Sequence, residues 1–382
     1  MSEREGVIRT TGGDVDPASL GMTSMHEHVL LDATVWYQVD PADSERLRDR
    51  PVTLDLLPDV RWHAYSSLDN LILADADAAA EELSAFRDAG GDAIVDTTSS
   101  GLGGDPRAVA AIADTTGVRV IVGAGHYVHA SHDPSVCAAS VDDLEEALDA
   151  EVREGVRGSG VRPGILGEIG MSAPPEACER RALRAAARVA VRYGMSVTIH
   201  VDGAGAFGLQ HVEDCVGEGL VPDRVVCGHA DEHMDREYHR SILTAGANLA
   251  FDTFGSELRF SGAFHHPSDA ERMRHVADLV DEGFGDQIVL GQDVFVKAHL
   301  HRYGGNGYDH LPRRVLPTLR ESYGVEQGML DRLVVENPRR LLTCRPPGTA
   351  HSSLRGGERG RTAGTVLAAI GESSQGGGNH GR

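Results

Sequence analysis

The sequence predicts a (β/α)8 barrel, on the basis of eight short apolar runs and the amphipathic stretches between them. The runs have the length and the residue types of β-strands. They lie at 23–31, 92–98, 118–125, 163–170, 195–201, 223–229, 247–253 and 287–293. Because strands that alternate with helices pair in parallel through right-handed crossovers, eight of them favour a closed barrel. A doubly wound open sheet stays an alternative, since periodicity alone does not show closure.

Helices are predicted where apolar residues recur every three or four positions. The clearest stretches are 79–89, which follows an insertion at 51–75, and 140–157, 176–193 and 269–282. The first strand–helix turn has no GxGxxG motif, which argues against a dinucleotide site.

Length and composition indicate one large domain. The chain has 382 residues and a hydrophobic content of 41%, which suffices for one barrel with insertions. We expect this barrel to span residues 1–345. Residues 346–382 are rich in Gly, Ser, Pro and Arg, so we expect a disordered tail there.

Charge and cysteine content exclude several classes of partner. The formal net charge of −22 argues against nucleic acid, because binding to phosphates depends on clustered Lys and Arg. No apolar run approaches the roughly 18 residues of a membrane span and no signal-like segment opens the chain, so we expect a cytoplasmic protein. The partner that we expect is a small-molecule substrate. The five cysteines have no CxxC spacing. We therefore expect reduced thiols, and neither a disulfide framework nor a thiolate zinc site.

Metal-binding side chains stand at or just past the ends of five of the predicted strands. His26 and His28 are two residues apart on the first strand, so both side chains reach the same side, while Glu27 points away. The others are Glu168, His200, His229 and Asp293. Because barrel enzymes place their chemistry at the C-terminal ends of the strands, the pattern predicts a metal site there.

The order of these residues resembles that of the amidohydrolase superfamily. The segments GMTSMHEHVLLD, GHADE and ENPRRLLT are similar to its phosphotriesterase family, from about residue 5 to 345. GEIG around Glu168 and KAHLHRYGGNGYDHL at 297–311 resemble the phosphotriesterase-related branch, in which a glutamate replaces a carboxylated lysine. The resemblance implies a binuclear site. His26, His28 and Asp293 would hold the more buried ion, His200 and His229 the more exposed one, and Glu168 would bridge the two; a homodimer is also implied.

The chemistry of these donors predicts a metal-dependent hydrolase. Lys297 is the only lysine in the sequence, so no carboxylated lysine is available at the bridge, and Glu168 supplies the two-oxygen anion instead. Imidazole and carboxylate suit two zinc ions, with manganese, cobalt or iron as alternatives. Two such ions share a water and lower its pKa towards neutrality. The resulting hydroxide would attack the substrate while Asp293 accepts its proton.

Three further residues are assigned roles by position. Asp231, two residues after His229, matches a proton-relay aspartate of the classical phosphotriesterases, but the relay histidine aligns with Thr253. Asp231 is therefore a catalytic proton carrier, a partner that orients a histidine, or a solvated loop carboxylate. Tyr127 lies where the family places an aromatic residue near the substrate. Lys297, four residues after Asp293, is expected to bind an anionic group of the substrate.

We expect attack on the carbonyl of a small lactone, ester or amide. Hydrolysis of an organophosphate triester or an imine is the alternative within the same chemistry. A noncatalytic, metal-stabilised ligand-binding barrel is the alternative from another class, which the presence of the presumed base Asp293 disfavours.

Overall fold

Eight parallel strands form one sheet in the computed structural model, which describes residues 6–39, 44–261 and 264–345. The predicted tail at 346–382 lies outside the described residues. Each strand coincides with one predicted run, although β8 extends one residue beyond its run. The bounds are β3 (Thr23–Glu27), β6 (Ala93–Asp96), β7 (Arg119–Ala124), β8 (Ile165–Met171), β9 (Val197–Val201), β10 (Val225–Cys227), β11 (Asn248–Phe251) and β14 (Ile288–Leu290).

The sheet closes between its first and last strands. The backbone N–H groups of Gln292 and Asp293, just past β14, donate to the carbonyl of His26 at 3.4 and 3.0 Å. A Cβ at Gly291 would lie 3.0 Å from the backbone nitrogen of His26, so this close approach requires glycine. The predicted barrel is confirmed, and the open-sheet alternative is wrong.

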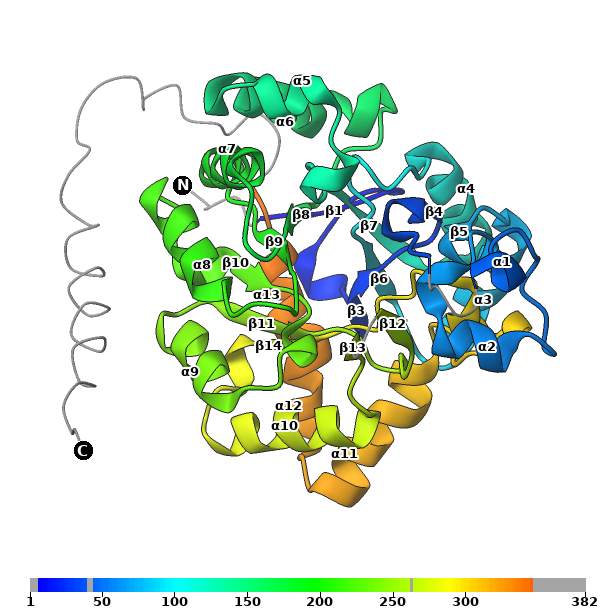
Figure 1. Cartoon of the computed structure of the whole chain (residues 1–382). Coiled ribbons are helices and arrows are strands. Elements are labelled where there is room, and N and C mark those ends of the chain that lie inside the picture. The colour runs from blue at the N-terminus through cyan, green and yellow to red at the C-terminus, as the bar shows by residue number, and fades with distance from the viewer. Residues whose placement is uncertain (1–5, 40–43, 262–263, 346–382) are drawn as a thin grey trace, which may run out of the picture.

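Helices surround the strands, as Figure 1 shows. The predicted helices are found as α3 (Ala76–Asp88), α6 (Val141–Glu154), α7 (Ala177–Tyr193) and α10 (Asp269–Asp281). Ser140 and Ser268 begin α6 and α10 with capping boxes, which satisfy exposed N–H groups of the first turn. The ring also contains α4 (Pro106–Thr116), α8 (Gly208–Gly217), α9 (Arg236–Thr244), α11 (Leu316–Tyr323) and α12 (Gln327–Asp331), while α13 (Asn337–Leu342) lies behind the strands in Figure 1 and contacts β1 and β14.

Short elements that the periodicity did not indicate occupy the connections. The segment after β3 holds the antiparallel pair of β4 (Leu31–Asp32) with β5 (Ile72–Leu73), and between them the short helices α1 (Ser44–Leu47) and α2 (Leu57–Trp62). The other additions are β1 (Ile8–Thr10), β2 (Gly13–Val15), α5 (Pro134–Ala138), β12 (Arg259–Ser261) and β13 (Phe264–His265). The segment from β4 to β5 brings aromatic residues over the barrel mouth.

The barrel interior is apolar in its lower half. A compact cluster of buried side chains comes from most of the strands, with Ile8, Leu20, Leu341 and Leu342 below them, and includes Met25, Ala93, Val95, Ile121, Ile165, Val226, Ala250 and Val289. Burial of each large apolar side chain contributes about 1.5–3 kcal/mol. The polar donors therefore lie above a packed floor, at the C-terminal ends of the strands.

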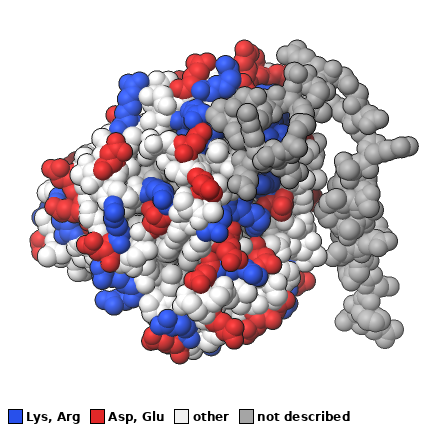
Figure 2. All heavy atoms as spheres, turned by 180° about the vertical axis from the view of Figure 1, so that it is seen from behind, with Lys and Arg blue, Asp and Glu red and all other residues white. Residues whose placement is uncertain are grey.

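The surface carries both signs of charge. Figure 2 shows acidic and basic side chains interspersed on the face opposite the view of Figure 1. Several arginines form ion pairs, such as Arg188 with Glu218 and Arg192 with Asp149. Within the described ranges, no helix combines the length and apolar character that crossing a bilayer requires.

Candidate active site

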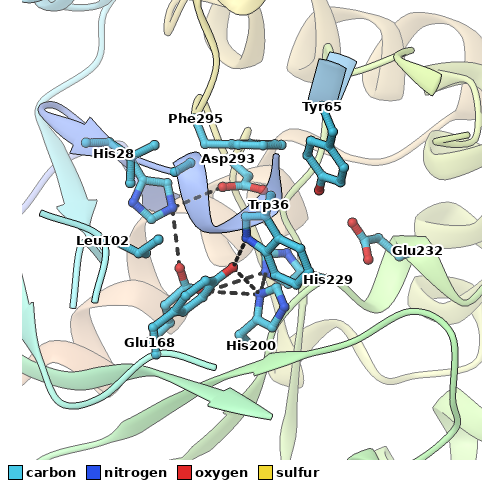
Figure 3. Close-up of a pocket in the computed structure, with 13 residues that line it drawn as sticks. His28, Trp36, Tyr65, Leu102, Glu168, His200, His229, Glu232, Asp293 and Phe295 are labelled. Carbon is cyan, nitrogen blue, oxygen red and sulfur yellow. Dashed lines mark hydrogen bonds and ion pairs between the residues drawn. The ribbon is translucent and has the colours of Figure 1, made fainter. Parts of the chain in front are cut away.

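Four histidines surround the carboxylate of Glu168 at the floor of the barrel mouth, and Figure 3 shows three of them, His28, His200 and His229. His28 Nε2 lies 3.4 Å from Oε1 of Glu168. Oε2 lies 3.5 Å from His26 Nε2, 3.4 Å from His200 Nδ1 and 3.5 Å from His229 Nε2. Glu168 comes from β8, and the histidines come from β3, β9 and the turn after β10. All five residues are buried.

The donor set fits metal ions. Two groups of three residues, His26–His28–Glu168 and Glu168–His200–His229, each bring their ligand atoms within 4.8 Å of one another, and both contain Glu168. His26 Nε2 and Glu168 Oε2 are buried without a hydrogen-bond partner among the described residues. Because an unsatisfied buried polar atom is costly, a ligand that these atoms share is the simplest explanation.

Asp293 completes one side of the cluster. Its Oδ1 lies 3.2 Å from His28 Nε2 and 3.7 Å from His26 Nε2, and its carboxylate lines the cavity above. Burial would raise its pKa, but the hydrogen bond to His28 and the charges of nearby histidines lower the pKa below its ordinary value. The backbone at Asp293 has a φ of 49°, a left-handed conformation that few residues other than glycine adopt. This turn aims the carboxylate back at the cluster.

Asp252, at the end of β11, was not predicted as a site residue. It is fully buried, and its Oδ2 lies 3.1 Å from His26 Nδ1. Its Oδ1 accepts hydrogen bonds from the backbone N–H of His229 at 2.9 Å and from the ring Nδ1 of His229 at 3.0 Å. One carboxylate therefore orients a histidine from each group. The same strand-end position that selected the ligands would have selected Asp252.

Asp231 lies behind this layer. Its carboxylate is fully buried, forms an ion pair with Arg272 at 3.0 Å, and accepts from the backbone N–H groups of Asp252 and Thr253 at 3.2 and 3.0 Å. The Thr253 hydroxyl also donates to it, at 2.9 Å. These contacts hold the end of β11. They place Asp231 beside Asp252 and outside the lining of the cavity.

Aromatic side chains wall the cavity, which has a volume of about 370 Å³ including its open mouth. Trp36 and Tyr65 stack with ring centroids 5.9 Å apart. The Tyr127 hydroxyl accepts from Trp36 Nε1 at 3.1 Å and lies 3.3 Å from His200 Nδ1. Phe295 and the carboxylate of Glu232 complete the upper wall of the cavity. Oε1 of Glu232 accepts a hydrogen bond from Nε2 of His266 at 2.7 Å. The structure thus brings Tyr127 to the cluster.

Lys297 lies elsewhere. Its ammonium forms an ion pair with Asp69 at 2.5 Å and sits 5.8 Å from the centroid of the Tyr303 ring. It lines a neighbouring hollow between β5 and α3 and is not part of the cavity wall. This arrangement does not support the expected contact between Lys297 and the substrate.

An eight-stranded barrel with a buried His and Glu cluster at its mouth is the architecture of a metal-dependent hydrolase. Residues 6–342 match the Phosphotriesterase family. The N-acetyltaurine hydrolases of Xenopus tropicalis and Bos taurus are each 34% identical to the chain, over 90% of it and 99% of their own length. A solved structure of a resiniferatoxin-binding protein from Rhodobacter sphaeroides is 35% identical, with a TM-score of 0.86, and the match covers 88% of this chain and 95% of that one.

The chain belongs to the phosphotriesterase family, within the amidohydrolase superfamily. The resemblance that the sequence motifs suggested is confirmed, and so is the expectation of a hydrolase with a metal-binding cluster.

Proposed function

We propose that the protein hydrolyses the carbonyl–nitrogen bond of a small N-acyl amide, with two divalent ions at the cluster. The observation that carries the proposal is the bridging position of Glu168, whose two oxygens face different histidines while Asp293 lies alongside. The relatives named N-acetyltaurine hydrolases favour an amide over the lactone or ester that the sequence also allowed.

The residues form two sets of potential metal ligands. His26, His28 and Asp293 would hold one ion, His200 and His229 the other, and Glu168 would contribute to both. Imidazole and carboxylate donors suit zinc, and manganese, cobalt and iron are the alternatives. When bound, such ions lower the pKa of water and polarise a carbonyl oxygen.

Asp293 is the proposed proton carrier. Its carboxylate faces the cavity from the cluster, so it can accept a proton from the attacking water and deliver it to the amine nitrogen that leaves. An amide needs this second transfer because its nitrogen would otherwise have to leave as an amide anion, which is a poor leaving group. Asp231 is a poor candidate for the same task, since its oxygens already bond Arg272 and the backbone at β11. We propose that Asp231 instead positions Asp252.

The upper wall favours an amine portion without a negative charge. Among the described residues, the cavity lining includes Glu232 and the faces of Trp36 and Tyr65, and it includes no Lys or Arg. Burial opposes ionisation of Glu232, but the hydrogen bond and charge of His266 hold the pKa of Glu232 below its ordinary value. An anion placed opposite the cluster would meet this carboxylate, whereas an ammonium would be attracted by it and by the aromatic faces.

A matched substrate set tests both parts of the proposal. N-acetyltaurine, N-acetylethanolamine and N-acetylethylenediamine share a two-carbon chain and end in a sulfonate, a hydroxyl and an ammonium. We expect metal-dependent release of acetate, abolished by chelator, with kcat/KM at least tenfold higher for the hydroxyl and ammonium compounds than for the sulfonate. A preference for the sulfonate compound would refute the claim that the cavity disfavours a negative charge, but it would leave the amide proposal standing. Turnover of a lactone or phosphotriester with no amide hydrolysed would refute the amide proposal.

The homodimer implied by the family resemblance is a separate proposal. Light scattering during size-exclusion chromatography of the full chain would test it, with a mass near twice the 40.7 kDa of one chain as the expected result.

A further inference from the structure

A second group of metal-binding side chains lies on the outer side of Tyr127. His129 and His132 belong to the connection that follows β7, Cys137 lies in α5, and Cys178 is the second residue of α7. Their spacing in the sequence follows no common zinc motif, because 40 residues separate the two cysteines. The fold nevertheless brings all four ligand atoms within 4.8 Å of one another.

The distances bring the four ligand atoms close enough to share one ion. The two sulfur atoms are 3.2 Å apart. Nδ1 of His129 lies 3.3 Å from Cys137 Sγ and 3.2 Å from Cys178 Sγ, and Nδ1 of His132 lies 3.7 Å from Cys137 Sγ. For a central zinc with Zn–S of about 2.3 Å and Zn–N of about 2.0–2.1 Å, a regular tetrahedron has edges of roughly 3.8 Å between two sulfurs and roughly 3.6 Å between sulfur and nitrogen. The two sulfurs, which are 3.2 Å apart, would therefore separate by a few tenths of an ångström when the ion binds.

We propose that His129, His132, Cys137 and Cys178 bind one structural zinc ion. Two thiolates and two imidazoles are a donor set that selects zinc among divalent ions, and four protein ligands leave no position open for catalysis. A disulfide between the cysteines would leave the approach of both histidines unexplained, and it requires the sulfurs at about 2.05 Å. This proposal departs from the expectation, drawn from the cysteine spacing, that the cysteines form no thiolate zinc site.

The ligands are oriented by contacts of the kind that metal-binding residues make. Nε2 of His132 donates to the carbonyl of Tyr127 at 2.6 Å, which leaves Nδ1 unprotonated and directed at Cys137. A hydrogen bond from the remote ring nitrogen to a backbone carbonyl is the usual support of a ligating histidine. The connection is also tied to α7, because Glu179 accepts from the backbone N–H of His129 at 2.7 Å and Arg181 donates to the carbonyl of Cys137 at 2.6 Å.

The location gives the ion a structural consequence. Tyr127 begins the segment that the ion would hold, and its hydroxyl contacts Trp36 and His200 in the active-site cavity. The zinc would therefore fasten the connection after β7 onto α7 and fix one wall of the cavity. This inference does not depend on the proposed amide substrate or on the ions at Glu168.

Cobalt substitution separates this site from the one at Glu168. Thiolate ligands give cobalt(II) a near-ultraviolet charge-transfer band, which a site of imidazoles and carboxylates does not produce. We expect the band in the full-length, cobalt-loaded protein, and its loss in Cys137→Ser and Cys178→Ser. Cys215→Ala, which removes a buried thiol from α8, is the matched control and should retain the band. Elemental analysis should give one zinc fewer per chain in both serine variants than in the control.

Alkylation of the unmodified chain keeps the test independent of variant folding. We expect zinc to slow iodoacetamide labelling of Cys137 and Cys178 at least tenfold, as read by peptide mass spectrometry, and chelator to remove the protection. Equal labelling with and without zinc, absence of the cobalt band, or a Cys137–Cys178 disulfide in protein kept under reductant would each overturn the proposal.

Discussion

Replacement of Asp252 by asparagine should weaken metal binding on one side of the cluster. A metal-binding nitrogen must be unprotonated, so both His26 and His229 must carry their proton on Nδ1. Asp252 accepts a hydrogen bond from Nδ1 of His229 and forms an ion-pair contact of 3.1 Å with Nδ1 of His26. Asparagine has one oxygen and one NH2 group. It can accept from only one of the two rings.

The geometry predicts which ring loses its partner. Oδ1 of Asp252 serves two donors of His229, the backbone N–H at 2.9 Å and the ring Nδ1 at 3.0 Å, while Oδ2 serves only Nδ1 of His26. The amide oxygen of Asp252→Asn should therefore face His229, and its NH2 group should face His26. His26 would then accept at Nδ1 and carry its proton on Nε2, the nitrogen that faces Glu168 and Asp293.

The magnitude follows from one buried contact with a charged group, the 3.1 Å ion pair between His26 and Asp252. Its loss costs about 1.5–3 kcal/mol, or roughly 10- to 100-fold in affinity. We expect this loss for the ion held by His26 and His28, and a smaller change for the ion at His200 and His229. Dialysis against chelator-buffered zinc, followed by elemental analysis, measures both affinities. The wild-type protein is measured in parallel, because the proposed zinc site at Cys137 and Cys178 contributes equally to both proteins.

Asp202→Asn is the control for the chemical change. Asp202 follows β9, and its Oδ1 accepts from the backbone N–H of Ala204 at 2.8 Å. The control should leave both affinities unchanged. Two ions bound with wild-type affinity in Asp252→Asn, or equal weakening of both, would refute the tautomer argument.

Four further predictions concern the base, the bridge, the lysine and acid stability. Asp293→Asn keeps an oxygen donor but removes the proton acceptor, so kcat should fall by about 100-fold or more while elemental analysis finds the metal retained. Reconstitution of chelator-treated protein should proceed equally with and without bicarbonate, because Glu168 needs no carboxylation; a requirement for bicarbonate would contradict this bridge. Lys297→Met should change kcat/KM for N-acetyltaurine and N-acetylethanolamine equally, since the ammonium pairs with Asp69; a selective loss on the sulfonate would restore the anion-binding role. Burial lowers the pKa of His211 to about 4, so the unfolded chain binds a proton that the native state excludes between pH 6.5 and 4. The neutral His211 side chain therefore contributes its full share to the free energy of unfolding above pH 6.5, and this contribution should fall by about 3 kcal/mol on acidification to pH 4. Urea titrations at several pH values measure this decrease, which should be absent from His211→Leu.

The barrel and the ligand positions could be predicted from the sequence because both depend on strand ends. In a parallel barrel, all C-terminal strand ends meet at one face, so residues far apart in the chain converge without knowledge of any contact. The strand periodicity placed Glu168 and Asp293 at that face, and the cluster contains both. Asp252 occupies an equivalent position, but its role depends on the direction of two ring nitrogens, which a strand pattern does not contain.

Residues in connections could not be placed in the same way. Lys297 stands four residues after Asp293, yet the 3-10 turn Lys297–His299 carries its ammonium to Asp69, which belongs to the segment between β3 and α3. The pairing of Cys137 with Cys178 likewise depends on how the connection after β7 lies against α7. No local pattern encodes such contacts, because each arises from two segments that meet only in the folded chain.

This division between strands and connections also bears on specificity. The groups that would perform the chemistry come from strands or from turns directly after them, where the backbone is held by the sheet. Most of the groups that would contact the rest of the substrate come from connections, with Trp36 and Tyr65 in the segment after β3 and Tyr127 after β7. Change in those connections can alter the cavity wall without displacing a ligand of the cluster. A relative with the same cluster can therefore act on a differently charged substrate, and in this chain Glu232 and the aromatic wall would determine which charge the proposed amide carries.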